Sequence, residues 1–166
     1  MDINIYADSS FWNNRGHYKV GIVICASDGR VLVKHAMRLD RREGRHTAVP
    51  VPIDSNIAAE YAAILLSIIS LRRIIKQYSL SEFALTINSD CESAVRQVSG
   101  DAVCLSTKIK ALHQKLLSDL ASIPNCTKWE VRWVSRSSAP MQEADRLSRG
   151  PEYEEWFFNR KGGEVV

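Results

Sequence analysis

Cysteine pairs of the kind that build disulfide frameworks or zinc sites are missing from this sequence. Its 166 residues contain four scattered cysteines, with no C-x-x-C pair and no histidine nearby at metal-ligand spacing: Cys25, Cys91, Cys104 and Cys126. Small secreted domains use clustered cysteines as disulfide frameworks, and zinc ligands come at short, regular spacings. We therefore expect four reduced thiols in an intracellular protein, in either the cytoplasm or the nucleus.

Long apolar runs, internal repeats and low-complexity segments are also absent. The most apolar stretch, 57–69, contains Glu60 and is too short to span a bilayer, so it predicts a core helix and no membrane contact. The chain opens directly on a strand pattern, and no signal peptide is expected. Its length is sufficient for one domain that buries its own core.

A strong charge of either sign is missing as well, since the net charge is only +3. Many proteins with a pI near 8.7 bind no anion, so composition alone does not predict a nucleic-acid partner. The basic residues of the loop 40–53 are more informative, because they stand close together: Arg41, Arg42, Arg45 and His46. This loop is either a solvated surface loop or a contact for phosphate groups.

The pattern of apolar residues predicts an α/β domain. Alternating apolar positions indicate strands at 3–10, 18–25, 31–39, 82–88 and 128–134. The first three follow one another through short loops, which favours an antiparallel meander. Helical spacing indicates helices at 57–77, 91–98, 106–123 and 141–149, the first of them beginning at a strong start signal, Asp54-Ser55-Asn56.

Four acidic residues occupy notable places in this pattern. Asp8 closes the first strand and Asp90 follows the fourth, and ligands of open α/β sheets bind at the carboxyl ends of strands. Glu60 lies among apolar residues of the first helix, where a buried carboxylate must be paired, protonated or bound to a cation. Asp145 lies in the last helix. Taken singly, Glu60 is also explained as an exposed acid favoured by the helix dipole, and Asp90 as a helix cap.

In this order the four acids resemble those of the ribonuclease H family. The matching segments are Tyr6-Ala7-Asp8-Ser9-Ser10, Ser55-Asn56-Ile57-Ala58-Ala59-Glu60, Asn88-Ser89-Asp90-Cys91 and Glu143-Ala144-Asp145-Arg146-Leu147-Ser148. Each motif is short, but their order, spacing and context together are distinctive, and the likeness extends from residue 3 to about residue 149.

The resemblance implies a ribonuclease H-like fold, with a mixed five-stranded sheet of three antiparallel strands followed by two parallel ones, flanked by helices. The catalytic domain would span 1–150, followed by an aromatic and polar tail, 151–166. The implied activity is hydrolysis of the RNA strand of RNA–DNA hybrids with two Mg²⁺ or Mn²⁺ ions, which prefer oxygen ligands. Asp8 would bridge both ions, Glu60 and Asp90 would hold the first, and Asp145 the second.

Substrate contacts are also implied by the resemblance. Asn56 stands where family members contact the hybrid, although a simple helix cap is the alternative explanation. The other expected substrate-binding residues are Ser9, Ser10, Cys91, Arg41, Arg42 and Arg45. Recognition of RNA in such hybrids rests on the 2′-hydroxyl groups in a shallow minor groove.

Several departures from the family pattern keep other functions open. Ser9 replaces the usual Gly, and Met141 stands where an Asn is common. Many members carry a His in the loop before the last acid, whereas the loop 135–140 has no His and contains only Arg136. A long basic insertion between the middle helices is also missing, so a partner domain could supply affinity. The alternatives are a catalytically weak or inactive nucleic-acid-binding or adapter module, a junction resolvase and an exonuclease. The exonuclease is disfavoured because the first strand ends in Asp8-Ser9-Ser10, without the Asp-x-Glu of those enzymes.

The aromatic residues of the tail allow two interpretations. Tyr153, Trp156, Phe157 and Phe158 lie within six residues of one another. Exposed apolar clusters of this size are unusual on monomers, so we expect the segment to fold back onto the domain. The alternative is a segment that docks onto a partner protein.

Overall fold

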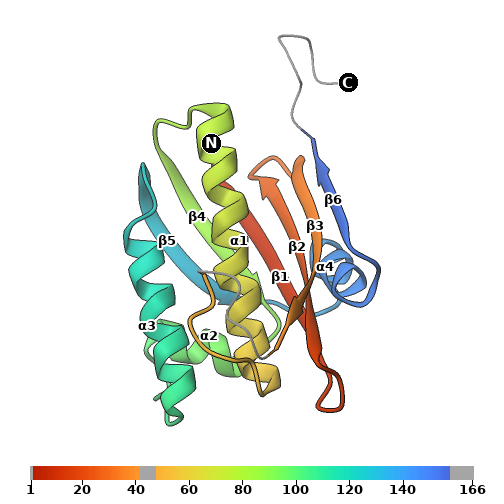
Figure 1. Cartoon of the computed structure of the whole chain (residues 1–166). Coiled ribbons are helices and arrows are strands. Elements are labelled where there is room, and N and C mark those ends of the chain that lie inside the picture. Colours follow the sequence, from red (N-terminus) through yellow and green to blue (C-terminus); the bar gives the residue numbers. More distant parts are fainter. Residues whose placement is uncertain (1, 42–47, 158–166) are drawn as a thin grey trace.

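A computed structural model describes residues 2–41 and 48–157 of the chain. Its centre is one mixed sheet with the strand order β5-β4-β1-β2-β3-β6 (Figure 1). The strands are β1 (Ile3–Phe11), β2 (His17–Ala26), β3 (Val31–Asp40), β4 (Phe83–Ser89), β5 (Cys126–Trp133) and β6 (Tyr153–Trp156). The first three are antiparallel, whereas β4 runs parallel to β1 and β5 parallel to β4. The predicted α/β class is confirmed, but the predicted number of five strands was too low by one.

Helices cover both faces of the sheet. They are α1 (Asn56–Tyr78), α2 (Glu92–Ser99), α3 (Thr107–Ala121) and α4 (Ala139–Arg149). The main core lies between α1, α3 and the side chains on one face of the sheet, and α4 packs on the opposite face over β1 and β2. Figure 1 shows α1 crossing the sheet diagonally, with α3 beside it. All four predicted helices are therefore present, with ends within two residues of the predicted ones.

The long helix α1 is buried on most of its circumference, as its sequence predicts. The Ser55 side chain accepts a hydrogen bond from the backbone N–H of Ala58 at 3.3 Å and so caps the helix. The helix ends at Ser79, which adopts a left-handed conformation with φ of 49°. Burial of this helix beside β1 places its first turns next to the end of that strand.

A glycine sets the distance between α4 and the sheet. Gly21 lies in β2, and a β-carbon there would stand 2.0 Å from the Ala144 carbonyl oxygen and 2.5 Å from the Ser148 backbone nitrogen. Only a residue without a side chain allows α4 to come this close. Pro140 lies in the first turn of α4, where its missing N–H costs nothing, so the helix begins two residues before the predicted start at Met141.

The sixth strand comes from the segment predicted as a tail. Residues 153–156 pair with β3, and the Phe157 N–H donates to the Leu32 carbonyl at 3.0 Å. The Arg73 guanidinium lies over the Trp156 ring, 5.6 Å from its centroid, and pairs with Glu154 at 3.2 Å. The described part of this aromatic segment therefore folds back onto the domain, while Phe158 lies outside the described residues. Whether 151–166 acts as a separate tail stays a prediction.

All four cysteines are free, which agrees with the expected reduced thiols. Across 2–41 and 48–157, no helix is long and apolar enough to cross a membrane.

Candidate active site

Three acidic side chains from distant parts of the chain converge at one end of the sheet. Asp8 comes from β1, Glu60 from the second turn of α1, and Asp90 from the residue after β4. One carboxylate oxygen of each lies within 4.8 Å of those of the other two. The convergence follows from topology, because β1 and β4 are parallel neighbours whose carboxyl ends meet at the same edge.

Asp8 is almost completely buried, with 1% of its surface exposed. Its Oδ2 accepts a hydrogen bond from the Ser148 hydroxyl at 2.7 Å, and its Oδ1 has no partner among the described residues. The pKa of Asp8 is raised to about 6, mainly by burial and also by the charges of Asp90 and Asp145, while the Ser148 hydrogen bond and the charge of Arg136 oppose the increase. The ionised form of Asp8 is therefore poorly stabilised by the protein alone.

Glu60 is held in a similar way. The Ser9 hydroxyl donates to its Oε1 at 2.6 Å, whereas its Oε2 is buried and has no hydrogen-bond partner within the described ranges. Burial, followed by the charge of Asp8, raises the pKa of Glu60 to about 8. With 8% of its surface exposed, Glu60 is not the solvated helix-end acid that the alternative explanation required. Ser9, where the family has Gly, thus orients this carboxylate.

Asp90 and Asp145 each have an arginine partner. The Arg136 Nε donates a short hydrogen bond to Asp90 Oδ2, and the Asp90 side chain is only 7% exposed. The alternative explanation of Asp90 as the cap of α2 is wrong, because Cys91 occupies that position. Asp145 lies outside the three-carboxylate cluster, and its Oδ1 accepts from Arg149 at 2.7 Å.

The donor set fits a divalent cation. Two buried carboxylate oxygens, Asp8 Oδ1 and Glu60 Oε2, lack a hydrogen-bond partner in the part of the chain that is described. Buried polar atoms of this kind call for a bound cation, a proton or a water. Oxygen-only ligands with a high local negative charge suit Mg²⁺ and Mn²⁺. Asp8, Glu60 and Asp90 are thus the residues that could hold a metal ion.

A pocket of about 430 Å³ opens beside the cluster. It is lined by Ser9, Ser10, Phe11, Trp12, Asn56, Glu60, Asp90, Cys91, Arg136 and Arg149. Four of the predicted substrate-binding residues therefore lie at this pocket: Ser9, Ser10, Asn56 and Cys91. Asn56 is exposed and is not the helix cap, since Ser55 fills that role. Its contact with a substrate stays a prediction.

Arg41 is engaged with the protein itself. Its Nη1 donates to the backbone carbonyls of Trp12, Asn13 and Arg15 at 3.3, 2.9 and 2.9 Å, and its Nε to that of Ile53 at 3.0 Å. These bonds favour a positioning role for Arg41, and its predicted contact with phosphate stays untested. The other predicted basic residues of this loop, Arg42, Arg45 and His46, lie outside the described residues.

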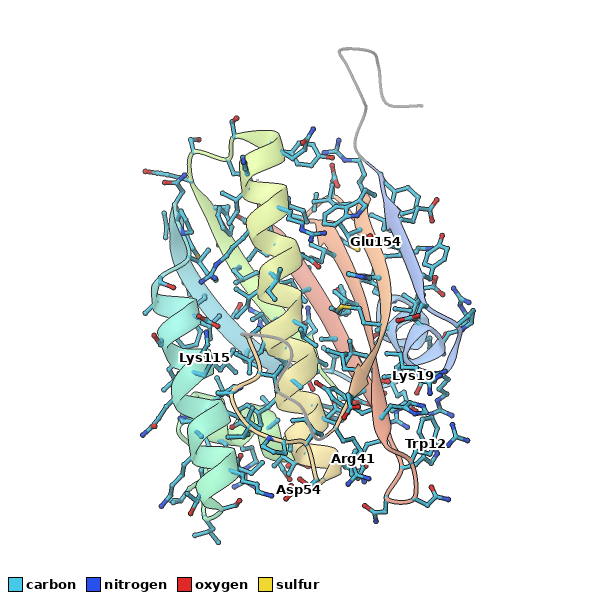
Figure 2. All side chains as sticks on the ribbon, viewed as in Figure 1. Trp12, Lys19, Arg41, Asp54, Lys115 and Glu154 are labelled. Carbon is cyan, nitrogen blue, oxygen red and sulfur yellow. The ribbon has the colours of Figure 1, made fainter. Side chains whose placement is uncertain are left out.

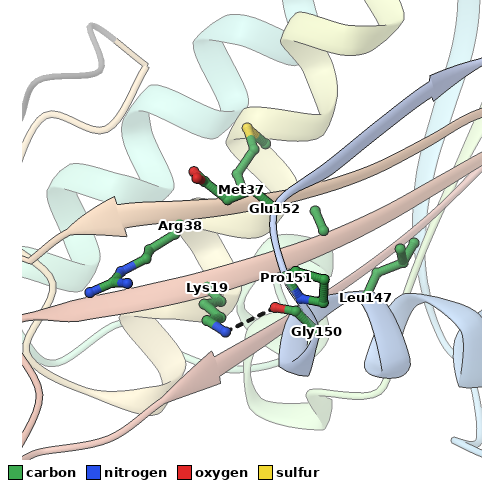
Figure 3. A pocket seen from close by; sticks show the side chains of 8 residues that line it. Lys19, Met37, Arg38, Leu147, Gly150, Pro151 and Glu152 are labelled. Atoms are coloured by element: carbon green, nitrogen blue, oxygen red, sulfur yellow. Dashed lines mark hydrogen bonds between the residues drawn. The ribbon is translucent and has the colours of Figure 1, made fainter.

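A second, smaller cavity of about 140 Å³ lies where the end of α4 meets β2 and β3 (Figure 3). Lys19 donates to the Gly150 carbonyl across it at 2.9 Å. This bond fastens the end of α4 to β2, so the residues around the cavity help to hold α4 in place.

No protein-family model matches the sequence, and no curated protein matches it. Solved structures do. LC11-RNase H1, in complex with an RNA/DNA hybrid, has a TM-score of 0.70 at 20% identity over 88% of this chain and 93% of its own. RNase H1 from the halophilic archaeon Halobacterium salinarum NRC-1 has 0.66 at 18% identity, over 89% and 95%. The chain has the ribonuclease H fold.

A further structure with the ribonuclease H fold, the N-terminal RNase H domain of a Mycobacterium tuberculosis protein, matches with a TM-score of 0.63 at 19% identity over 89% and 96%. These likenesses confirm the predicted fold over nearly the whole chain. At such identities a fold does not establish an activity, so the function must be argued from the site.

Sequence reasoning missed the residues that support the acids within this ribonuclease H fold. Ser148 holds Asp8 from 140 positions away, and Arg149 and Arg136 pair with acids that were considered alone. One signal was available: Gly21 interrupts an otherwise apolar strand, which is typical of a close backbone approach. A serine or arginine in a short polar helix offers no comparable signal.

Proposed function

We propose that this protein is a metal-dependent endonuclease that hydrolyses the RNA strand of RNA–DNA hybrids. The observation that carries the proposal is the buried cluster of Asp8, Glu60 and Asp90 at the sheet end of a ribonuclease H fold, with two oxygens that find no partner among the described residues. The likeness to LC11-RNase H1, which was solved with an RNA/DNA hybrid, supports the choice of substrate.

The proposed ligands are Asp8, Glu60, Asp90 and Asp145, for two Mg²⁺ or Mn²⁺ ions. When bound, such ions supply a water that is more easily deprotonated and a counter-charge for the leaving oxygen of the phosphodiester. Asp145 pairs with Arg149 in this structure, and the Arg149 side chain is 60% exposed. That exposure lets the arginine move away and release the Asp145 carboxylate.

The chain's own residues prepare this site. The Ser148 hydroxyl binds one oxygen of Asp8 and the Ser9 hydroxyl one oxygen of Glu60, so the other oxygen of each carboxylate, which has no partner among the described residues, stays available for a metal ion. Asn56 and Ser10 line the pocket with hydrogen-bonding groups that suit the 2′-hydroxyls of an RNA strand. Arg136 and Arg149 add positive charge at the pocket wall for the phosphates.

The direct test is cleavage of an end-labelled RNA–DNA hybrid with Mg²⁺ or Mn²⁺, beside double-stranded RNA, single strands and a four-way DNA junction. We expect hybrid-specific cutting of the RNA strand that requires metal and is lost in Asp8→Asn. The matched control is Asp28→Asn, which removes an exposed acid in the turn between β2 and β3. Cutting of the junction alone would replace the proposal with a resolvase, and trimming from strand ends with an exonuclease.

One observation favours a second candidate, a nucleic-acid-binding module without turnover. Arg136 and Arg149 already pair with Asp90 and Asp145, and a protein that binds no metal would keep those ion pairs. Calorimetric titration with Mn²⁺ separates the two candidates. Absence of both metal binding and cleavage, with hybrid binding retained, would overturn the nuclease and establish the binding module.

A further inference from the structure

An exposed turn beside the acidic cluster carries an aromatic and a cationic side chain that the proposed reaction does not use. It joins β1 to β2, and residues 13–16 are all exposed. The Arg15 guanidinium stacks on the Trp12 ring, 4.3 Å from the ring centroid. Trp12 also lines the pocket that contains Glu60 and Asp90. Trp12 therefore stands at the wall of the candidate active site, and Arg15 is stacked on it.

The charge of Arg15 is not neutralised by the described part of the protein. Most arginines there pair with a carboxylate, as Arg30 does with Asp28 and Arg132 with Glu130. No carboxylate in 2–41 or 48–157 forms an ion pair with Arg15. Stacking occupies the flat face of the guanidinium and leaves its N–H edge available for an anionic oxygen.

The backbone of the turn is held in place before any ligand arrives. Arg41 donates to three carbonyls of the turn, and its fourth hydrogen bond reaches Ile53, two residues before the cap of α1. The Ile53 N–H donates back to the Arg41 carbonyl at 3.0 Å. Figure 2 shows Trp12, Arg41 and Asp54 at the same end of the molecule. A contact made from so rigid a turn loses little conformational entropy on binding.

We propose that the Trp12–Arg15 stack is a second contact point for the nucleic-acid substrate, outside the acidic cluster. The Arg15 guanidinium binds a backbone phosphate of the strand that leaves the pocket, and the Trp12 ring packs against the adjoining sugar. Planar guanidinium groups match phosphate oxygens in pairs, and an indole ring provides an apolar face beside the charge. The inference rests on the proposed function for the identity of the ligand as an RNA–DNA hybrid.

The experiment measures equilibrium binding of a fluorescein-labelled hybrid of about 20 base pairs by anisotropy, over a series of KCl concentrations. All proteins carry Asp8→Asn, so that cleavage does not interfere. Arg15→Ala should weaken binding about fivefold at low salt and lower the slope of log K against log salt by about one, because one phosphate contact is lost. Trp12→Ala should weaken binding about tenfold with the slope unchanged, as expected for the loss of an uncharged packing contact.

Three further variants keep the test independent of folding and of the acidic site. Arg15→Lys retains the charge and should retain the salt slope, and Trp12→Phe should retain most of the affinity. Arg30→Ala removes an exposed arginine at the opposite end of β2 and should change neither quantity. Wild-type affinity and slope in both Arg15→Ala and Trp12→Ala would overturn the inference. Cleavage of the hybrid is measured separately with the wild-type protein. Failure of the nuclease proposal can therefore be distinguished from failure of this inference.

Discussion

Gly21 lies directly opposite Asp8 in the β1–β2 ladder, and the backbone of α4 passes over it. The two residues share a face of the sheet, so the space left by the missing side chain of Gly21 is the space that α4 fills. Ser148 of that helix thereby reaches Asp8 with a 2.7 Å hydrogen bond. The closeness of one helix to one strand thus supports the central acid of the site.

Substitution of Gly21 tests this arrangement. The β-carbon of Gly21→Ala would overlap the Ala144 carbonyl oxygen, so α4 must move outward. We expect a loss of about 3 kcal/mol in the free energy of unfolding, measured by urea denaturation, together with loss of hybrid cleavage. The matched control is Gly16→Ala, where a β-carbon meets no atom within 4 Å. Equal stability of the two variants would contradict the proposed close contact.

Removal of the Ser148 hydroxyl should weaken metal binding while leaving the fold intact. In Ser148→Ala the Oδ2 of Asp8 loses its hydrogen-bond donor, and Oδ1 has none among the described residues, so the pKa of Asp8 should rise above about 6. Groups that orient a metal ligand typically contribute about tenfold to a hundredfold in affinity. The Mg²⁺ concentration for half-maximal cleavage should increase by at least about tenfold. Ser93→Ala, an exposed serine of α2, is the control and should leave this concentration unchanged.

The stability of the metal-free protein should fall as pH rises from about 5 to about 8.5. Burial raises the pKa of Asp8 to about 6 and that of Glu60 to about 8, so both carboxyls bind protons more tightly in the folded state. Stability from a raised pKa is present below the unfolded value and is lost as pH passes through the folded value. Melting temperatures measured in a chelating buffer at several pH values check this expectation.

Two additions sharpen the pH experiment. Glu60→Gln should flatten the pH profile between about 4.3 and about 8, because the titrating group is removed. Mg²⁺ should raise the melting temperature more at the alkaline end, where both carboxylates are ionised without it. A melting temperature that increases with pH in chelator would show that these two acids do not control stability.

Arg136 should compete with the metal for Asp90. Its guanidinium donates to Asp90 Oδ2 and also lowers the pKa of Asp8 by its charge. In Arg136→Gln the competing cation is absent, so Mn²⁺ should bind about tenfold more tightly, equivalent to about 1.4 kcal/mol, in calorimetric titration. Arg132→Gln removes a neighbouring exposed arginine that pairs with Glu130 and serves as the control. Weaker Mn²⁺ binding in Arg136→Gln would mean that Arg136 supports the metal site.

Local patterns in the sequence were sufficient to determine the four helices, the first five strands and the places of the acids. Alternating apolar residues specify the first five strands, and Ser55 followed by a long apolar run specifies α1. Asp8 and Asp90 could be assigned to one edge of the sheet because strand ends follow from the same patterns. These features depend on residues that are neighbours along the chain, which is why they can be read without a structure.

Other features were decided by the tertiary structure alone. The sixth strand forms because residues 153–156 find the free edge of β3, which no pattern in those four residues indicates. The donors that hold the acids, Ser148 and Arg136 among them, are chosen by how closely α4 and the loop before it approach the sheet. The sequence places Arg41 in a basic loop, but in the structure its side chain donates hydrogen bonds to backbone carbonyls of a distant turn. Such pairings depend on distances between segments far apart in the chain, and packing rather than periodicity sets those distances.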